Sequence, residues 1–231
     1  MNSLREVLEV TSGLPAAGII LSIAAYGFGV FVCRKYRLNF VNPLLIGIVI
    51  VCAVIALTPL SVEKYNAGGA MLVFFILPAT TVLAINVYNQ REVMRQNFIP
   101  LLAGCTAGSI ASIASIKLLC RVLSLDAAIL NSLLPKSVTT AIALELAAKN
   151  GGILSITVIA ITITGLSTSI LGPVLIKRLG LKDRVAAGCA MGMAGHAIGT
   201  ARALQIGPVE GGMAGISLCL AGIITSILLS V

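Results

Sequence analysis

In the stretch LPKSVTT, residues 134–140, a lysine and three hydroxyl side chains follow a proline along the chain, inside the apolar run 125–148. A charge at the centre of a membrane span costs about 2.5–3.5 kcal/mol on insertion scales, so Lys136 is expected to have a function there. Pro135 removes a backbone donor and interrupts a helix. Interrupted backbone at membrane depth is tolerated only inside protein or beside a water-filled cavity. The stretch therefore predicts a polar site within the bilayer.

The rest of the chain has the composition of a membrane protein. Of its 231 residues, 58% are hydrophobic and 10% are charged, and the mean hydropathy is +1.07. Soluble domains carry about 25% charged residues. Because a spanning helix needs about 20 apolar residues, we expect an all-α polytopic membrane protein with about eight segments, forming one domain over 1–231. The apolar runs are 14–33, 41–58, 67–89, 98–120, 125–148, 152–176, 185–206 and 209–231.

Several function classes are disfavoured. The net charge of +8 sits in short connections, aromatic residues make up 4%, and Trp is absent, so no nucleic-acid partner is expected. No nucleophile–base triad, phosphate-binding loop or zinc motif is visible, so we expect no enzyme, no metal and no cofactor. The cysteines stand singly, outside any CxxC or Cys/His cluster: Cys33, Cys52, Cys105, Cys120, Cys189 and Cys219.

Helix-breaking residues mark both the ends and the interiors of the runs. LPATT at 77–81 resembles LPKSVTT at 134–140, and paired breaks of this kind indicate an inverted repeat of transporter type. Chance recurrence of Leu-Pro in a Leu-rich chain is the alternative. The expected breaks lie at Asn42, Pro43, Pro78, Pro135, Gly195 and Gly199.

Basic residues gather in three connections, and the positive-inside rule assigns such connections to the cytoplasm. Eight full spans would divide the three between both sides. If 125–148 enters and returns as a re-entrant hairpin, they share one side, with the N-terminus outside and the C-terminus inside. The basic connections are Arg34, Lys35 and Arg37; Arg91 and Arg95; and Lys177, Arg178, Lys182 and Arg184.

The lysine and its neighbours suit an anion. Ser137, Thr139 and Thr140 open the downstream half-helix, whose free N–H groups and positive dipole favour a negative charge. With Lys136, they predict a carboxylate site. The alternative is a lysine at a loop end that extends to the headgroups.

Other polar residues in the apolar runs are candidates for the same site. Thr80 and Thr81 follow the first break. His196, the chain's only histidine, could bind substrate or relay a proton together with Thr200, although a structural hydrogen bond explains it equally well. Candidate coupling groups or charge partners, which could instead be interfacial residues, are Glu145, Arg202 and Glu210.

These motifs resemble the LrgB family over nearly the whole chain. The matching stretches are NPLLIG (42–47), LPATTVLAINVYNQ (77–90), LPKSVTTAIALELAAKNGGI (134–153), GCAMGMAGHAIGTARAL (188–204) and EGGMAGISLCLAGIITSIL (210–228). The chain departs from the family pattern at Ala141 and Asn86, where prolines are usual, and both positions lie just beyond the expected breaks.

The resemblance implies two kinds of function. The family includes antiholin-like bacterial proteins that act with LrgA/CidA-type membrane partners on murein hydrolase activity and autolysis, and the C-terminal part of the plant plastidial glycolate/glycerate translocator. A cation at a broken helix suits small 2-hydroxy and 2-oxo acids and has no obvious use in a holin regulator, so we expect a secondary transporter of small monocarboxylates such as pyruvate, glycolate, glycerate or lactate. The alternative is an antiholin-like regulator. We further expect a bacterial cytoplasmic membrane location, coupling to H⁺ or Na⁺, and a homodimer by analogy with elevator-type carriers.

Overall fold

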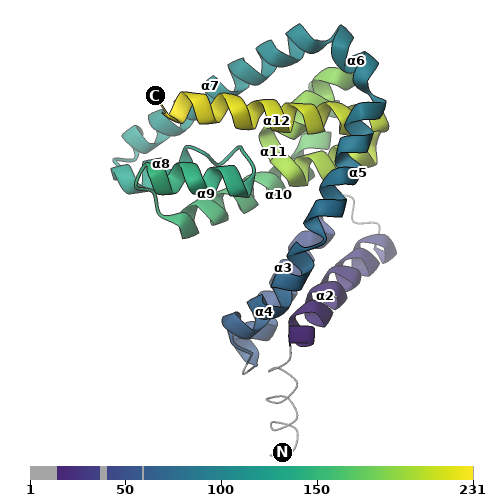
Figure 1. Ribbon diagram of the computed structural model, residues 1–231, viewed down its shortest axis with the longest axis vertical. Coiled ribbons are helices and arrows are strands. Elements are labelled where there is room, and N and C mark those ends of the chain that lie inside the picture. Colours follow the sequence, from purple (N-terminus) through teal and green to yellow (C-terminus); the bar gives the residue numbers. More distant parts are fainter. Residues whose placement is uncertain (1–14, 37–40, 59, 231) are drawn as a thin grey trace, which may run out of the picture. The chain divides into compact units, whose positions relative to one another are not determined.

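The computed structural model describes residues 15–36, 41–58 and 60–230. Within these ranges the chain is helical throughout and contains no strand (Figure 1). The helices are α2 Pro15–Lys35, α3 Pro43–Leu57, α4 Val62–Val73, α5 Ile76–Asn89, α6 Arg91–Gln96, α7 Phe98–Val122, α8 Ala127–Leu133, α9 Thr140–Lys149, α10 Leu154–Arg178, α11 Arg184–Ile206 and α12 Pro208–Ser230.

Four of these helices are long and apolar enough to cross a membrane: α2, α7, α10 and α12. The pair α4 and α5, bent by 41° between its two parts, makes a fifth candidate span. The expected all-helical, multi-span architecture is therefore confirmed. The eight expected segments are not eight long helices. Helix α3 has only 15 residues, and the apolar runs 125–148 and 185–206 are each broken into two shorter helical parts.

The chain divides into two compact units, Met1–Val82 and Leu83–Val231. In the first unit α2 packs against both α3 and α4. The contact with α4 is close, because a methyl group at Gly18 would overlap the backbone of Tyr65. Asn42 caps α3 by accepting a hydrogen bond of 2.8 Å from the Leu44 amide, and Pro43 occupies the first turn. These contacts define the start of α3.

The bend between α4 and α5 lies just before Pro78. Proline lacks the amide that would donate to the carbonyl four residues earlier, which is Phe74. The helix is interrupted at Phe74 and Phe75 and resumes at Ile76. This interruption is a bend of 41°, not a reversal of the chain.

In the second unit, α8 and α9 form a helical hairpin, here called the first hairpin, whose tip is residues 134–139. The side-chain amide of Asn131 donates to the Asn150 carbonyl at 2.6 Å, and the Ile153 amide donates to Ser132 Oγ at 2.7 Å. The chain leaving α9 thus returns to lie beside α8. With 7 and 10 residues, the arms are only about 10 and 15 Å long, against a hydrocarbon core of about 30 Å.

α11 is a second hairpin. His196 has φ 40° and ψ −133°, so the helix is broken there into two arms, 184–195 and 197–206. A methyl group at Gly199 would overlap the Met191 carbonyl oxygen, eight residues earlier and therefore far away in a straight helix. Ala203 also packs with Met191. The run 185–206, expected to be a broken or spanning segment, therefore doubles back on itself at His196.

The tips of both hairpins reach the same residue of α10. Val138, in the first tip, packs against Ile161 and Ala143. The Nε2 atom of His196, at the second tip, lies 2.9 Å from the Ile161 carbonyl and donates its proton to it. Ile161 belongs to the candidate span Leu154–Arg178, so both interrupted segments meet inside a spanning helix.

Candidate functional site

The second unit contains a cavity of about 1020 Å³ that is open to the outside and is formed by α7, the first tip, α10, α11 and α12. One charged side chain, Lys136, reaches it from the first tip, and another, Asp183, lies at the start of α11. The rest of the polar lining consists mainly of hydroxyl groups. These belong to Ser109, Ser112, Ser115, Ser137, Thr164, Ser167, Thr168 and Thr225.

Lys136 forms a compact group with two serines. Its Nζ donates to Ser137 Oγ at 3.1 Å and to Ser112 Oγ at 3.4 Å. The two serine oxygens are 3.1 Å apart. The lysine is half-buried, and its hydrogen-bond partners in the described structure are neutral, so its positive charge remains available to an anion in the cavity.

The depth of this group follows from the helix positions. Ser112 lies near the middle of α7, which runs from Phe98 to Val122, and Thr164 and Thr168 lie near the middle of α10. Because both helices are long enough to span a membrane, the polar part of the cavity lies at mid-span. Asn97 and Asp183 also line the cavity, so it extends toward the end where α7 and α11 begin.

His196 and Thr200 support the second tip and are absent from the cavity wall. Both are buried, and Thr200 Oγ1 donates to the His196 carbonyl at 2.8 Å. The His196 ring occupies the space beside Gly165, where an added Cβ would lie 2.7 Å from its Cε1 atom. Their described contacts are structural, whereas their neighbours Met193 and Ala194 do line the cavity.

The expected threonines lie in different places. Thr139 caps α9 by position without a side-chain hydrogen bond, Thr140 is exposed, and neither lines the cavity. Thr80 and Thr81 belong to the first unit, where each donates to the Leu77 carbonyl, at 2.8 and 3.0 Å. Lys136 and Ser137 are therefore the two expected substrate-binding residues that line the cavity.

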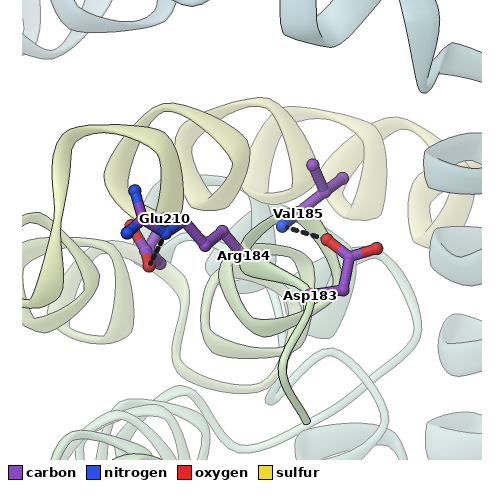
Figure 2. A network of polar contacts seen from close by, with 4 residues as sticks. All are labelled: Asp183, Arg184, Val185 and Glu210. Carbon is purple, nitrogen blue, oxygen red and sulfur yellow. Dashed lines mark hydrogen bonds and ion pairs between the residues drawn. The ribbon is translucent and has the colours of Figure 1, made fainter.

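The candidate charge partners do not contact Lys136 in the described structure. Glu145 is exposed on α9, and Arg202 donates to Gln205 Oε1 at 2.7 Å. Figure 2 shows the exposed Arg184 extending toward the buried Glu210, with 3.8 Å between Nε and Oε1. This ion pair joins the start of the second hairpin to the start of α12 and so closes the base of the hairpin.

Sequence reasoning missed the part of the site contributed by α7. Ser109, Ser112 and Ser115 recur every third residue within an apolar helix. Residues three and four apart share a helix face, so this spacing already indicated a polar stripe. No group of three potential metal ligands occurs among the residues that the structure describes.

Comparison with known proteins gives a consistent family. The model of the LrgB-like family matches residues 22–231. The antiholin-like protein LrgB of Bacillus subtilis (strain 168) is 36% identical over 218 residues, which covers 94% of each chain. The proteins of the same name from Bacillus mycoides (strain KBAB4) and Bacillus cereus (strain B4264) are each 34% identical over 216 residues, covering 93% of this chain and 94% of theirs. No solved structure matches the chain significantly. The chain, a multi-span helical membrane protein, belongs to the LrgB-like family.

Proposed function

We propose that the protein is a secondary transporter of small monocarboxylates and that its substrate binds at Lys136. The observation that carries the proposal is the half-buried lysine, hydrogen-bonded to Ser112 and Ser137 at the mid-span end of the cavity. Ionisable residues at this depth mark substrate or ion pathways. A charge-assisted hydrogen bond from an ammonium group to a carboxylate is roughly twice as strong as a neutral one.

The cavity lining fits the rest of a short oxygenated acid. Once a carboxylate accepts from Lys136, Ser112 and Ser137, the Ser167 hydroxyl, which also lines the cavity, can donate to a 2-oxo group. Thr164 and Thr168 donate to the Ala160 and Thr164 carbonyls, at 2.7 and 2.9 Å, so their oxygens can accept from a 2-hydroxy group. This matches pyruvate, lactate, glycolate and glycerate as a class. The volume of about 1020 Å³ exceeds that of one such molecule, and the excess extends toward the helix end, as an access path would.

The order of the elements supports alternating access. A hairpin followed by a span occurs twice, as 127–149 with α10 and as 184–206 with α12. α10 leads from the base of the first hairpin to that of the second, so the hairpins enter from opposite ends. Interrupted segments in inverted repeats, meeting near the midplane, are typical of secondary transporters. This pairing differs from the one expected between 77–81 and 134–140.

We also propose an orientation for the second unit. Val93, Met94 and Val185 pack around the same core residues, so the basic connections before α7 and before α11 share one end. The positive-inside rule puts that end in the cytoplasm. Because the second hairpin returns to its own side, α12 then leads outward and the C-terminus lies outside. The expectation of an inside C-terminus treated 125–148 as a re-entrant hairpin and 185–206 as a full span. The cations at this end are Arg91, Arg95, Lys177, Arg178, Lys182 and Arg184.

The second candidate function is regulation of murein hydrolase activity together with an LrgA-type partner. The name of the relatives, antiholin-like protein LrgB, supports this candidate more directly than it supports transport. A regulator of this kind acts through lipid-facing or loop residues and tolerates loss of the Lys136 charge.

The transporter proposal includes three further points. We place the protein in the bacterial cytoplasmic membrane, as a homodimer, and we expect transport to be coupled to H⁺ or Na⁺.

Uptake of labelled acids by the purified protein in proteoliposomes tests the transporter proposal. Labelled pyruvate, glycolate and glycerate should each be offered, with and without a small LrgA-like protein in the same vesicles. We expect saturable uptake of at least one acid. Absence of flux for all of them, in both kinds of vesicle, would reject the transporter and leave the regulator.

A further inference from the structure

Two cysteines on different helices face each other at the wall of the cavity. The Sγ atoms of Cys105 in α7 and Cys189 in the first arm of the second hairpin are 3.8 Å apart. Both are free thiols in this structure. The sequence separates them by 84 residues, so the pair is created by packing alone.

Their surroundings differ in a way that matters for reactivity. Cys189 is half-buried and lines the cavity, whereas Cys105 is fully buried, with its thiol 3.9 Å from the Ser217 carbonyl. A Cβ added to the neighbouring Gly104 would lie 3.7 Å from Cys189 Sγ, in van der Waals contact, so this sulfur packs directly against α7. A disulfide requires about 2.05 Å between the sulfurs, so the two sulfur atoms must come closer by about 1.8 Å for the bond to form.

We propose that Cys105 and Cys189 are a site of reversible oxidation by peroxides that enter through the cavity. The Cys189 sulfur attacks a peroxide oxygen, the O–O bond breaks, and a sulfenic acid forms with release of water. The Cys105 sulfur then attacks the sulfenic sulfur; the S–S bond forms, the S–O bond breaks, and a second water leaves. In sum, two thiols give two electrons to one hydrogen peroxide and yield one disulfide and two waters. A dithiol reductant returns the disulfide to two thiols by thiol–disulfide exchange and is itself oxidised to a disulfide.

The bond would tie the second hairpin to α7 across one wall of the cavity. If the protein transports by alternating access, which rests on the function proposed above, the two walls must separate or slide during each cycle. Oxidation therefore stops transport in one conformation. A reducing cytoplasm keeps both thiols free in ordinary conditions, so the lock forms only under oxidative stress.

The test uses the full chain in proteoliposomes treated with hydrogen peroxide and then with dithiothreitol. Free thiols are counted after denaturation, linked peptides are identified by mass spectrometry, and uptake is measured on the same vesicles. Cys105→Ser removes the thiol that lies outside the cavity wall, and the serine hydroxyl can still donate to the Ser217 carbonyl. Cys219→Ser, at an exposed position on α12, is the matched control.

We expect wild type and Cys219→Ser to lose both thiols of the pair, to give a peptide linking Cys105 to Cys189, and to lose uptake until reduced. Cys105→Ser should form no such link and should keep its uptake under peroxide. A wild-type protein that forms no Cys105–Cys189 link, or forms it while uptake continues, would overturn the inference. If untreated vesicles show no uptake, the transport proposal fails, while the thiol count still decides whether the pair is an oxidation site.

Discussion

Ser112 shows how a single residue contributes to the proposed site. Its Oγ lies 3.4 Å from Lys136 Nζ and 3.1 Å from Ser137 Oγ, and it belongs to α7, whereas both of those residues lie in the first tip. It therefore fixes the direction of the lysine as well as adding a hydroxyl. The sequence could indicate Lys136 and Ser137, because a cation behind a proline is conspicuous in an apolar run. It could not indicate which helix faces them.

Replacing Ser112 by Ala should raise the KM for the transported acid by roughly two- to tenfold, because one hydrogen bond contributes about 0.5–1.5 kcal/mol. Initial uptake rates at a series of pyruvate, glycolate or glycerate concentrations measure the effect. Thr106→Ala is the matched control, since Thr106 lies on the same helix, donates to the Leu102 carbonyl at 2.8 Å, and is outside the cavity wall. Equal KM values for the two variants would remove Ser112 from the site.

His196 carries backbone strain, because φ 40° with ψ −133° is a region that glycine tolerates and other residues rarely adopt. His196→Gly keeps the turn and loses the hydrogen bond to Ile161 together with the packing of the buried ring beside Gly165. His196→Ala loses that bond and keeps the strain. We expect the Ala variant to be less stable than the Gly variant by about 1–2 kcal/mol, measured as thermal unfolding in detergent. An Ala variant that melts at or above the Gly variant would contradict the hairpin turn at His196.

At the scale of elements, hydropathy identified the long helices but not the second hairpin. The run 185–206 is long and apolar enough to be taken for a span. Its reversal depends on a positive φ at a histidine and on glycines that let the arms touch. The glycines are visible in the sequence and gave the expected breaks at Gly195 and Gly199, but the reversal itself depends on packing against α10 and α12. The first hairpin was easier to anticipate, because Pro135 interrupts a helix and Lys136 places a charge inside an apolar run.

Cysteine accessibility tests both hairpins. In a background without native cysteines, single cysteines at Asp126 and Lys149 flank the first hairpin, and those at Lys182 and Gln205 flank the second. Two hairpins entering from opposite ends predict that the first pair reacts with an impermeant maleimide from one side of the membrane and the second pair from the other. Labelling of Asp126 and Lys149 positions from opposite sides would show that 125–148 crosses the membrane.

The close packing of the second hairpin gives a stability prediction. A methyl group at Gly192 would overlap the Ala214 carbonyl oxygen, so Gly192→Ala must separate the hairpin from α12. Overpacking of this kind costs about 1–3 kcal/mol. Gly69→Ala is the control, because nothing lies within 4 Å of its added Cβ and alanine favours a helix. The melting temperature should fall for Gly192→Ala alone, and a fall of equal size for both variants would refute this packing.

For the whole molecule, composition was enough to establish an all-helical membrane protein, since lipid leaves backbone groups only each other as partners. The division into two units was not visible, because it depends on tertiary contacts and no linker of distinct composition separates them. The cavity also escaped prediction. It joins residues from 97 to 225 that are far apart in the chain, and a single sequence does not reveal such proximity.

The most direct test of the whole account is the rate of monocarboxylate uptake by Lys136→Ala in proteoliposomes. Lys136→Arg retains the charge, and Lys149→Ala removes an exposed lysine at the end of α9. A charge-assisted hydrogen bond is worth about 1.5–3 kcal/mol, so kcat/KM should fall roughly ten- to hundredfold in Lys136→Ala. The fall should be smaller in Lys136→Arg, and Lys149→Ala should match wild type, with all three proteins folded and inserted normally. Undiminished uptake by a well-folded Lys136→Ala protein would contradict a carboxylate site at this lysine.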